Sequence, residues 1–258
     1  MPTLLLRGKP IGSIKGVLFD KDGTLSNSED HLLNLAKLRI LEISKLLKSQ
    51  NSSFKKEKEA KELLCKAYGL TNEELSPNGA LAIGSRETNL ISTATVLCLL
   101  GETWPKALEM SNQAFHLVDG IDKKTGKKDE KRSLLPGVNE ILKSLCKANV
   151  ICAVISNDSI AGIQEFLIRN NIKEFLKHFW SAEHHPTKPS PAAVIELCKE
   201  INLQPYECAL VGDADSDLLM ARKSGIGITL GYRGGWSKQP NLTKHQYLIN
   251  SWDELSIL

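Results

Sequence analysis

The chain has 258 residues, of which 41% are hydrophobic and 24% are charged, so it is long enough to bury a sizeable core. Its net charge is only +3 and its aromatic content is 5%, which argues against a surface that binds nucleic acid. No apolar run is long enough for a signal peptide or a membrane span, so we expect a cytoplasmic protein without a membrane partner.

The six cysteines predict free thiols. No two of them form a Cys-x-x-Cys pair, and four lie in segments that resemble apolar helices or strands. This pattern favours unpaired thiols in a reducing compartment over a zinc site or disulfides. The cysteines are Cys65, Cys98, Cys146, Cys152, Cys198 and Cys208.

The first half of the chain predicts one strand followed by helices. The strand covers residues 16–20, and no strong strand signal occurs between residues 26 and 133. Apolar residues recur at steps of three and four from Ser28 to about Leu47, the spacing of one helix face. Further helices are predicted over residues 55–68, over residues 86–100 and from residue 103 toward Gly120.

The second half predicts alternating helices and strands, which is typical of a parallel sheet covered on both faces. The predicted strands cover residues 150–156, 178–184, 208–212, 226–231 and 246–250, and the predicted helices cover residues 135–149, 159–170, 190–201 and 215–225.

Together the two halves predict an α/β protein with a Rossmann-like parallel sheet and an inserted all-helical domain. We place the core domain at residues 1–25 and 134–258 and the helical domain at residues 26–133. The charged segment at residues 122–132 is interpreted as an exposed connector rather than as a basic patch for a partner.

Polar side chains gather at the predicted strand ends, where ligands bind in open parallel sheets. The stretch Gly16–Ser28 ends its apolar run with Asp20, Lys21 and Asp22, and two carboxylates so close together repel each other. Three later strands are followed by further polar groups, namely Ser156, Asn157 and Asp158, then Lys188, and then Asp213, Asp215 and Asp217.

These residue types fit phosphoryl transfer. Aspartates from two strand ends supply the oxygen ligands that Mg²⁺ prefers, and Ser156 and Asn157 are candidate phosphate-binding residues. Lys188 brings positive charge to the reacting groups. Asp20 is a candidate nucleophile that would form an aspartyl-phosphate, and Asp22 is a candidate acid and base.

The sequence resembles the haloacid dehalogenase superfamily. The segments "FDKDGT", "VISND", "KPSP" with Lys188, and "GDADSD" resemble its four motifs, in the family's order. The helical insertion resembles a C1-type cap, as in the branch of phosphoglycolate phosphatase and β-phosphoglucomutase. The resemblance implies a Mg²⁺-dependent phosphatase acting on a small phosphorylated metabolite, of the phosphoglycolate or sugar phosphate type.

The same resemblance implies the role of each motif residue. Asp20 would be nucleophile and metal ligand, and Asp22 would be acid and base and offer its backbone carbonyl to the metal. Asp213 would bind the metal directly, and Asp217 directly or through water. Lys21 departs from the apolar residue common in the family, and the sequence leaves open whether it faces solvent or substrate.

Several other residues have competing interpretations. Arg86 either clamps an anionic group of the substrate or pairs with a surface acid. Asp215 is interpreted as the N-cap of the next helix, and Asp158 as either a cap or a site residue. His184 and His185 are interpreted as loop residues rather than metal ligands.

Three alternative functions remain at this stage. A dehalogenase is disfavoured because it does not need the acid at Asp22. A phosphomutase would use the same residues but return the phosphoryl group to the sugar. A catalytically silent regulatory or binding module is disfavoured by the complete catalytic set. The sequence does not predict the substrate, or whether the protein is a monomer or a homodimer.

Overall fold

The computed structural model describes residues 1–50, 53–71, 74–125 and 133–258 and divides the chain into two compact units. One unit joins Met1–Ser28 to Arg132–Leu258, and the other comprises Glu29–Lys131. Within the described residues, none of the helices combines the length and the apolar character needed to cross a lipid bilayer.

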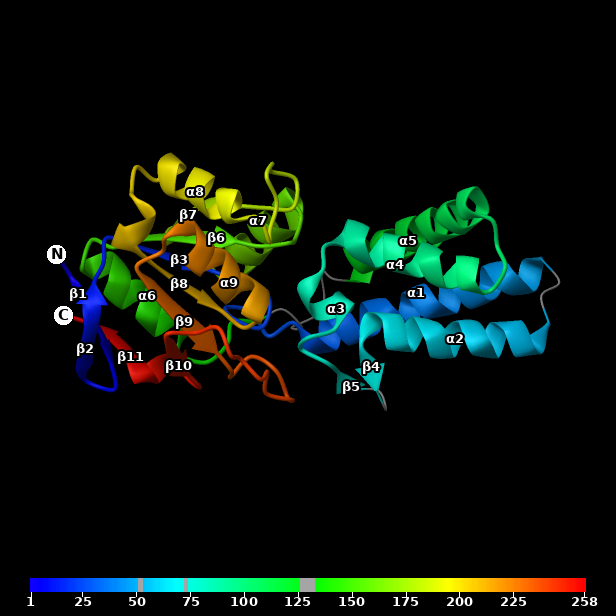
Figure 1. The fold of residues 1–258 in the computed structure, drawn as a ribbon, viewed down its shortest axis with the longest axis horizontal. Coiled ribbons are helices and arrows are strands. Elements are labelled where there is room, and N and C mark those ends of the chain that lie inside the picture. Colours follow the sequence, from blue (N-terminus) through cyan, green and yellow to red (C-terminus); the bar gives the residue numbers. More distant parts are fainter. Residues whose placement is uncertain (51–52, 72–73, 126–132) are drawn as a thin grey trace. The chain divides into compact units, whose positions relative to one another are not determined.

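The first unit is built on a six-stranded sheet whose neighbouring strands are all parallel, in the order β10-β9-β8-β3-β6-β7 (Figure 1). This confirms the predicted α/β Rossmann-like fold. All six strands overlap segments predicted from the sequence. They are β3 (Gly16–Phe19), β6 (Ile151–Ile155), β7 (Leu176–Trp180), β8 (Cys208–Gly212), β9 (Ile228–Tyr232) and β10 (Tyr247–Ile249).

Helices cover both faces of this sheet because the buried strand residues alternate in direction. Val17 and Phe19 belong to a core shared with α6 (Val138–Lys147) and α7 (Ile160–Arg169). Leu18 belongs to the opposite core, shared with α8 (Pro191–Glu200) and α9 (Asp215–Ser224). The 3₁₀ helices η1 (Pro205–Glu207) and η2 (Trp252–Glu254) precede β8 and β11.

A small antiparallel sheet, which we did not predict, joins the two ends of the chain (Figure 1). It consists of β1 (Thr3–Leu6), β2 (Lys9–Ser13) and β11 (Leu255–Ile257). Arg7 and Gly8 form the hairpin turn between β1 and β2 with φ angles of 50° and 75°. Two successive positive φ angles are typical of a tight turn that matches the twist of the strands.

The second unit is a helical bundle. Helix α1 packs against α2 and α5, and α4 also packs against both of them. Apolar residues at helical spacing, including Ala36, Ile40 and Ile43, form its buried interior. The helices are α1 (Glu29–Ser49), α2 (Phe54–Tyr68), α3 (Ala80–Ile83), α4 (Arg86–Leu99) and α5 (Trp104–Thr125).

This unit differs from the sequence prediction in three places. It contains a two-stranded hairpin, β4 (Leu70–Thr71) and β5 (Glu74–Leu75), so it is not purely helical. The one-turn helix α3 was not predicted. Helix α5 continues through Thr125, into the segment predicted to be a loop, and residues 126–132 of that predicted connector lie outside the described residues.

All six cysteines are free thiols, as predicted. Cys152, Cys198 and Cys208 are buried in the first unit, whereas Cys146 is exposed. Burial raises the pKa of the Cys152 thiol to about 12, so this sulfur stays protonated at neutral pH.

Candidate active site

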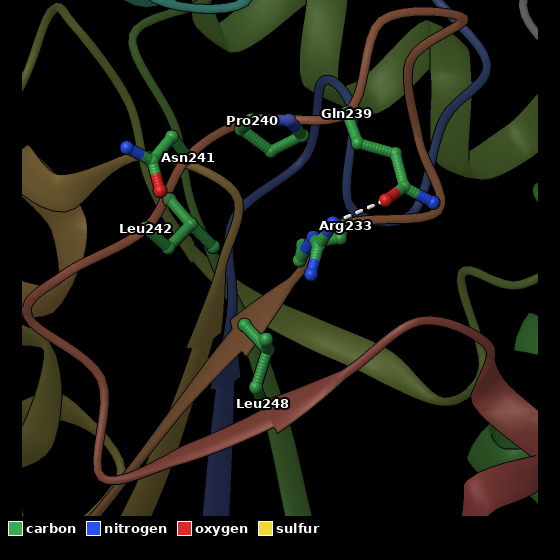
Figure 2. A pocket seen from close by; sticks show the side chains of 6 residues that line it. All are labelled: Arg233, Gln239, Pro240, Asn241, Leu242 and Leu248. Atoms are coloured by element: carbon green, nitrogen blue, oxygen red, sulfur yellow. Dashed lines mark hydrogen bonds between the residues drawn. The ribbon is translucent and has the colours of Figure 1, made fainter.

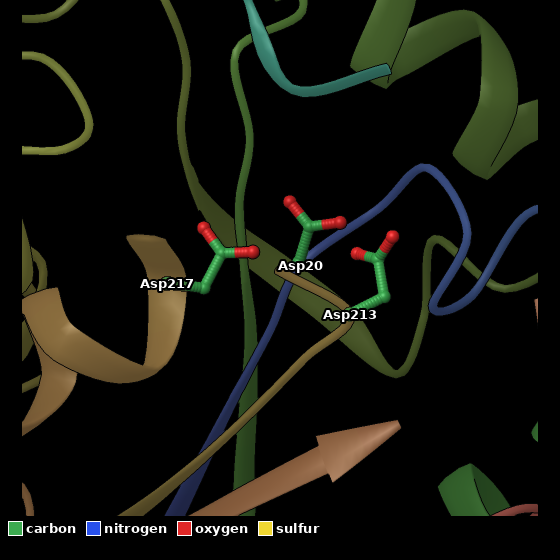
Figure 3. Close-up of side chains that lie close together, drawn as sticks. All are labelled: Asp20, Asp213 and Asp217. Carbon is green, nitrogen blue, oxygen red and sulfur yellow. The ribbon is translucent and has the colours of Figure 1, made fainter. Parts of the chain in front are cut away.

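Three buried aspartates converge at the carboxyl ends of two neighbouring strands (Figure 3). Asp20 directly follows β3, Asp213 directly follows β8, and Asp217 lies in the first turn of α9. One oxygen from each carboxyl group lies within 4.8 Å of the others. The three side chains point to the same side in Figure 3, so they face one common space.

Lys188 brings a positive charge into this cluster. Its Nζ donates to Asp20 Oδ1 at 2.6 Å and lies 2.7 Å from Asp217 Oδ1. A third, longer contact of 3.4 Å reaches the carbonyl of Ile155 at the end of β6. Both carboxylates and the ammonium group are buried, so little water screens them from one another.

The electrostatics of the cluster follow from this burial. Burial raises the pKa of Asp20 to about 6, although the Lys188 ammonium opposes the shift. Burial and the neighbouring Asp20 and Asp217 carboxylates also raise the pKa of Asp213 well above its usual value. For Lys188, burial alone would lower the pKa, but the two carboxylates outweigh it and raise the pKa. A second cation would therefore be strongly favoured here.

Asp213 is held by two donors that the sequence analysis did not single out. Thr24 Oγ1 donates to Asp213 Oδ1 at 3.2 Å, and the buried Trp236 donates its indole N–H to Asp213 Oδ2. Gly23 makes this packing possible because its φ is +76° and a Cβ there would lie 2.2 Å from Trp236 Nε1. Trp236 follows the end of β9, a strand end at which the sequence predicted no site residue.

Asp22 lies outside the cluster of three aspartates. Its Oδ1 accepts from Lys21 Nζ at 2.7 Å and from the hydroxyl of Ser28. The turn that carries it is closed by the Lys21 carbonyl, which accepts from the backbone N–H groups of Leu25 and Ser26. The Asp22 side chain is 25% exposed, so a ligand can reach it from solvent.

The next strand end supplies the residues predicted to bind phosphate. Ser156 is buried, and its hydroxyl accepts from the Asp158 backbone N–H at 3.1 Å. Ser159, rather than Asp158, is the N-cap of α7. Asp158 instead accepts from the Ser159 backbone N–H at 2.7 Å and pairs with Lys21 at 3.1 Å. Asn157 lies in the same turn and is half-buried.

The structure excludes one of the alternatives left open for Lys21 and corrects the interpretation of Asp215. Lys21 does not face solvent, because its side chain is only 2% exposed. Asp215 is not the N-cap of α9, since Ala214 takes that position and Asp215 is the first helical residue. The Asp215 carboxylate accepts from the backbone N–H and hydroxyl of Thr243, both at 2.8 Å, and so fixes the loop before β10.

The two adjacent histidines have no metal-binding geometry among the described residues. The Nδ1 atom of His184 lies 2.7 Å from the hydroxyl of Ser181, and its ring centroid lies 4.8 Å from that of Trp180. His184 therefore has a structural role in the loop after β7, in line with the loop interpretation.

Arg86 belongs to the helical unit and makes an ion pair there. Its guanidinium group contacts Asp119 Oδ2 through Nε at 2.8 Å and through a terminal nitrogen at 2.7 Å. It also lies 5.4 Å from the ring centroid of Phe115. The pairing partner is thus Asp119 on α5, a surface acid 33 residues along the chain.

A separate small pocket of about 140 Å³ lies beside the loop after β9 (Figure 2). The guanidinium group of Arg233 donates to Gln239 across it. None of the three clustered aspartates lines this pocket. Its lining residues are Arg233, Gln239, Pro240, Asn241, Leu242 and Leu248.

The aspartate cluster fits a divalent metal ion. Asp20, Asp213 and Asp217 offer oxygen ligands, which Mg²⁺ prefers, and Lys188 balances only one of three carboxylates. Burial and neighbouring carboxylates raise the pKa values of Asp20 and Asp213, so added positive charge would reduce the repulsion in the cluster. Three of the four residues predicted as metal ligands thus lie together, and the role of the Asp22 backbone carbonyl stays a prediction.

A parallel sheet with acidic residues at the carboxyl ends of its central strands belongs to the α/β proteins that bind ligands at that edge. The chain belongs to the haloacid dehalogenase-like hydrolases, since the model of that family matches residues 14–225. This confirms the superfamily predicted from the four motifs.

Relatives of known sequence agree with the predicted branch. Residues of this chain are 31% identical to "Phosphoglycolate phosphatase" of Vibrio vulnificus strain YJ016 over 131 residues, which is 49% of this chain and 57% of that protein. A protein of the same name from Pseudomonas fluorescens strain Pf0-1 is 29% identical over 127 residues. This match covers 48% of this chain and 47% of that protein. The matches thus span about half the length of these relatives.

Solved structures share the fold across almost the whole chain. A predicted phosphoglycolate phosphatase from Haemophilus somnus 129pt has a TM-score of 0.66 at 20% identity, covering 94% of this chain and 96% of that chain. A putative beta-phosphoglucomutase from Thermotoga maritima has a TM-score of 0.57 at 15% identity, covering 93% and 96%. At these identities the similarity supports the fold alone.

Proposed function

We propose that the protein is a Mg²⁺-dependent phosphatase that hydrolyses a small phosphorylated metabolite through an aspartyl-phosphate on Asp20. The observation that carries this proposal is the cluster of Asp20 with Asp213, Asp217 and Lys188. The names of the relatives, phosphoglycolate phosphatases, support a substrate of the phosphoglycolate type, and a sugar phosphate is the other candidate.

In the first step, a carboxylate oxygen of Asp20 attacks phosphorus and the bond to the leaving oxygen breaks. Lys188, 2.6 Å from Asp20, reduces the repulsion between the carboxylate and the anionic phosphoryl group. Asp22, which enters this step protonated, gives its proton to the departing alkoxide and is left as a carboxylate. The backbone turn at Ser156 and Asn157 binds the phosphoryl oxygens.

In the second step, Asp22 takes a proton from water, and the water oxygen attacks phosphorus. The bond to Asp20 breaks, inorganic phosphate leaves and the Asp20 carboxylate is regenerated. Asp20, Asp213, Asp217 and the backbone carbonyl of Asp22 would hold the Mg²⁺ ion. When bound, this ion neutralises negative charge on the phosphoryl oxygens and orients them for in-line attack.

A phosphate-release screen tests this function. Purified protein is incubated with phosphoglycolate and a panel of sugar phosphates, with Mg²⁺, with Ca²⁺, or with chelator, and Asp20→Asn serves as the inactive control. We expect release with Mg²⁺ only, because Ca²⁺ takes more ligands at longer distances. Phosphate release in excess chelator would contradict the metal assignment, and NMR detection of an isomerised sugar phosphate without release would identify a mutase.

A further inference from the structure

Lys21 is a buried positive charge that contacts the carboxylates of Asp22 and Asp158. Its Nζ lies 2.7 Å from Asp22 Oδ1 and 3.1 Å from Asp158 Oδ2, and its side chain is 2% exposed. The same ammonium group lies 5.5 Å from the ring centroid of Phe166 on α7. Lys21 therefore connects the turn after β3 with the turn after β6.

The position of Lys21 would suit an apolar residue better if only stability mattered. Val17 and Phe19 precede it at the two-residue spacing of one sheet face, and both belong to the same apolar core as Phe166. Burying an ammonium group in such surroundings is costly, even when carboxylates pair with it. The contacts that this lysine makes therefore point to a role beyond packing.

Those contacts fix Asp22 against a rigid element. Asp22 is held by Lys21 and by the hydroxyl of Ser28. Asp158, the other partner of Lys21, is itself held by the backbone N–H of Ser159, the N-cap of α7. The chain of contacts from Asp22 through Lys21 to Asp158 thus ends at the first turn of a packed helix.

We propose that Lys21 is a positioning residue for Asp22 and that Asp158 anchors Lys21. The pair sets the place of the Asp22 carboxylate relative to the leaving oxygen of the substrate, and the inference rests on the proposed function. A displaced Asp22 would affect substrates differently, according to their leaving group. A substrate with a poor leaving group needs the proton from a well-placed Asp22, whereas a nitrophenyl phosphate does not.

The test compares Lys21→Met and Asp158→Asn with an alkyl phosphate and nitrophenyl phosphate. For Lys21→Met we expect kcat on the alkyl phosphate to fall by about 100-fold, the effect of a small displacement of a catalytic group. The rate of the first-turnover nitrophenol burst, which precedes the step that needs Asp22 as base, should change less than about threefold. Asp158→Asn should also slow the alkyl phosphate more than nitrophenyl phosphate, but by a smaller factor, because Lys21 keeps its contact with Asp22.

Two controls separate positioning from structural damage. Lys15→Met removes an exposed lysine at the other end of β3, where it pairs with Glu207 at 2.6 Å, and should leave both rates unchanged. In an Asp22→Asn background, Lys21→Met should cause no further loss on the alkyl phosphate, because both changes act through the same carboxyl group.

Equal losses on the two substrates, or additive losses in the double variant, would overturn the positioning role and leave the proposed function standing. Unchanged rates for Lys21→Met on both substrates would overturn it as well. If the wild-type protein released phosphate from neither substrate, the proposed function would fail and the positioning role with it.

Discussion

At the scale of single residues, the buried carboxyl groups that could bind a metal ion also destabilise the metal-free fold, and Asp213 is an example. It shares a buried space with Asp20 and Asp217, while only Lys188 contributes a positive charge to these three groups in the contacts described above. The raised pKa of Asp20, about 6, means that the folded protein binds a proton there more tightly than the unfolded chain does. Stability therefore falls as the pH rises from about 4 toward 6 and stays lower above it.

Replacing Asp213 by Asn should stabilise the metal-free protein at pH 7. The amide carries no charge, so it ends the electrostatic repulsion of this side chain with the Asp20 and Asp217 carboxylates, and it still provides an oxygen for the Trp236 indole N–H. We expect Tm in chelator to rise by about 2–4 °C, which corresponds to about 1 kcal/mol in a domain of this size. Added Mg²⁺ should raise the Tm of the wild type but not of the variant.

Asp215→Asn is the matched control for that experiment. Burial would raise the pKa of Asp215, but hydrogen bonds from Thr243 and Lys244 outweigh it and lower the pKa. A lowered pKa means that the carboxylate stabilises the fold at pH 7, so this variant should have a lower Tm. A fall in Tm for Asp213→Asn as well would show that its hydrogen bonds matter more than the charge repulsion.

The contribution of Asp22 to the rate of phosphoryl transfer should depend on the leaving group of the substrate. We expect Asp22→Asn to slow phosphoryl transfer from an alkyl phosphate by about 10²–10⁴-fold, the usual contribution of general acid catalysis. Transfer from nitrophenyl phosphate should be affected far less. Because the variant also lacks the base for the second step, nitrophenol should appear in a burst as phosphoenzyme accumulates.

Rapid-quench and stopped-flow measurements of nitrophenol detect that burst. Asp20→Asn should show none with either substrate, since its amide cannot attack phosphorus. Equal slowing of both substrates by Asp22→Asn, without a burst, would mean that Asp22 is not the proton carrier.

At the scale of secondary structure, the sequence predicted the helices and strands whose apolar residues follow a clear pattern. The central strands β3, β6 and β8 are continuous apolar runs, and the long helices repeat apolar residues every three or four positions. The small sheet was missed for a physical reason. Its strands β1, β2 and β11 have three to five residues each, and β2 contains Pro10 and Gly12, which weaken a strand signal.

The site was predictable where it depends on strand ends and not where it depends on the turns between them. The residues Asp20, Asp213, Asp217 and Lys188 follow from reading each strand end in order. The donors from Thr24 and Trp236 to Asp213 do not, because the course of a loop is not encoded by periodicity. The bond between Asp158 and Lys21 likewise depends on two turns meeting in space.

Glu102 gives a pH-dependent link between elements of the helical unit. It lies between α4 and α5 and accepts from Lys56 on α2 at 2.6 Å and from Lys106 on α5 at 2.7 Å. These bonds lower the pKa of Glu102, so its stabilising effect is present above its unfolded value of 4.5 and is lost as the pH falls through the lowered value.

We expect Glu102→Gln to reduce stability at pH 7 by about 1 kcal/mol, the upper range for partly exposed ion pairs. At pH 3 the two proteins should unfold at nearly the same temperature, as measured by calorimetry. Glu57→Gln is a control with a longer contact, 3.5 Å to Lys48, and should have a smaller effect. A Glu102→Gln deficit of the same size at both pH values would show that the side chain acts through packing.

At the scale of the whole molecule, the chain leaves its α/β unit after the turn that carries Asp22 and returns before α6. The helical unit Glu29–Lys131 is thus inserted between Asp22 and the later strand ends that complete the aspartate cluster. Arg86 is the residue of that unit for which the sequence leaves open a role in substrate binding, and in the structure it pairs with Asp119.

Arg86→Ala tests whether the inserted unit contributes to specificity. If the guanidinium group binds an anionic group of the metabolite, kcat/KM for the best metabolite should fall by about 10–100-fold, the value of a hydrogen bond to a charged group. Activity on nitrophenyl phosphate, which lacks that second group, should change less than about twofold. Asp119→Ala removes the partner of Arg86 but keeps the guanidinium group, so it should preserve kcat/KM for the metabolite. Equal losses on both substrates, or a loss in Asp119→Ala as large as in Arg86→Ala, would assign the pair to the stability of the helical unit instead.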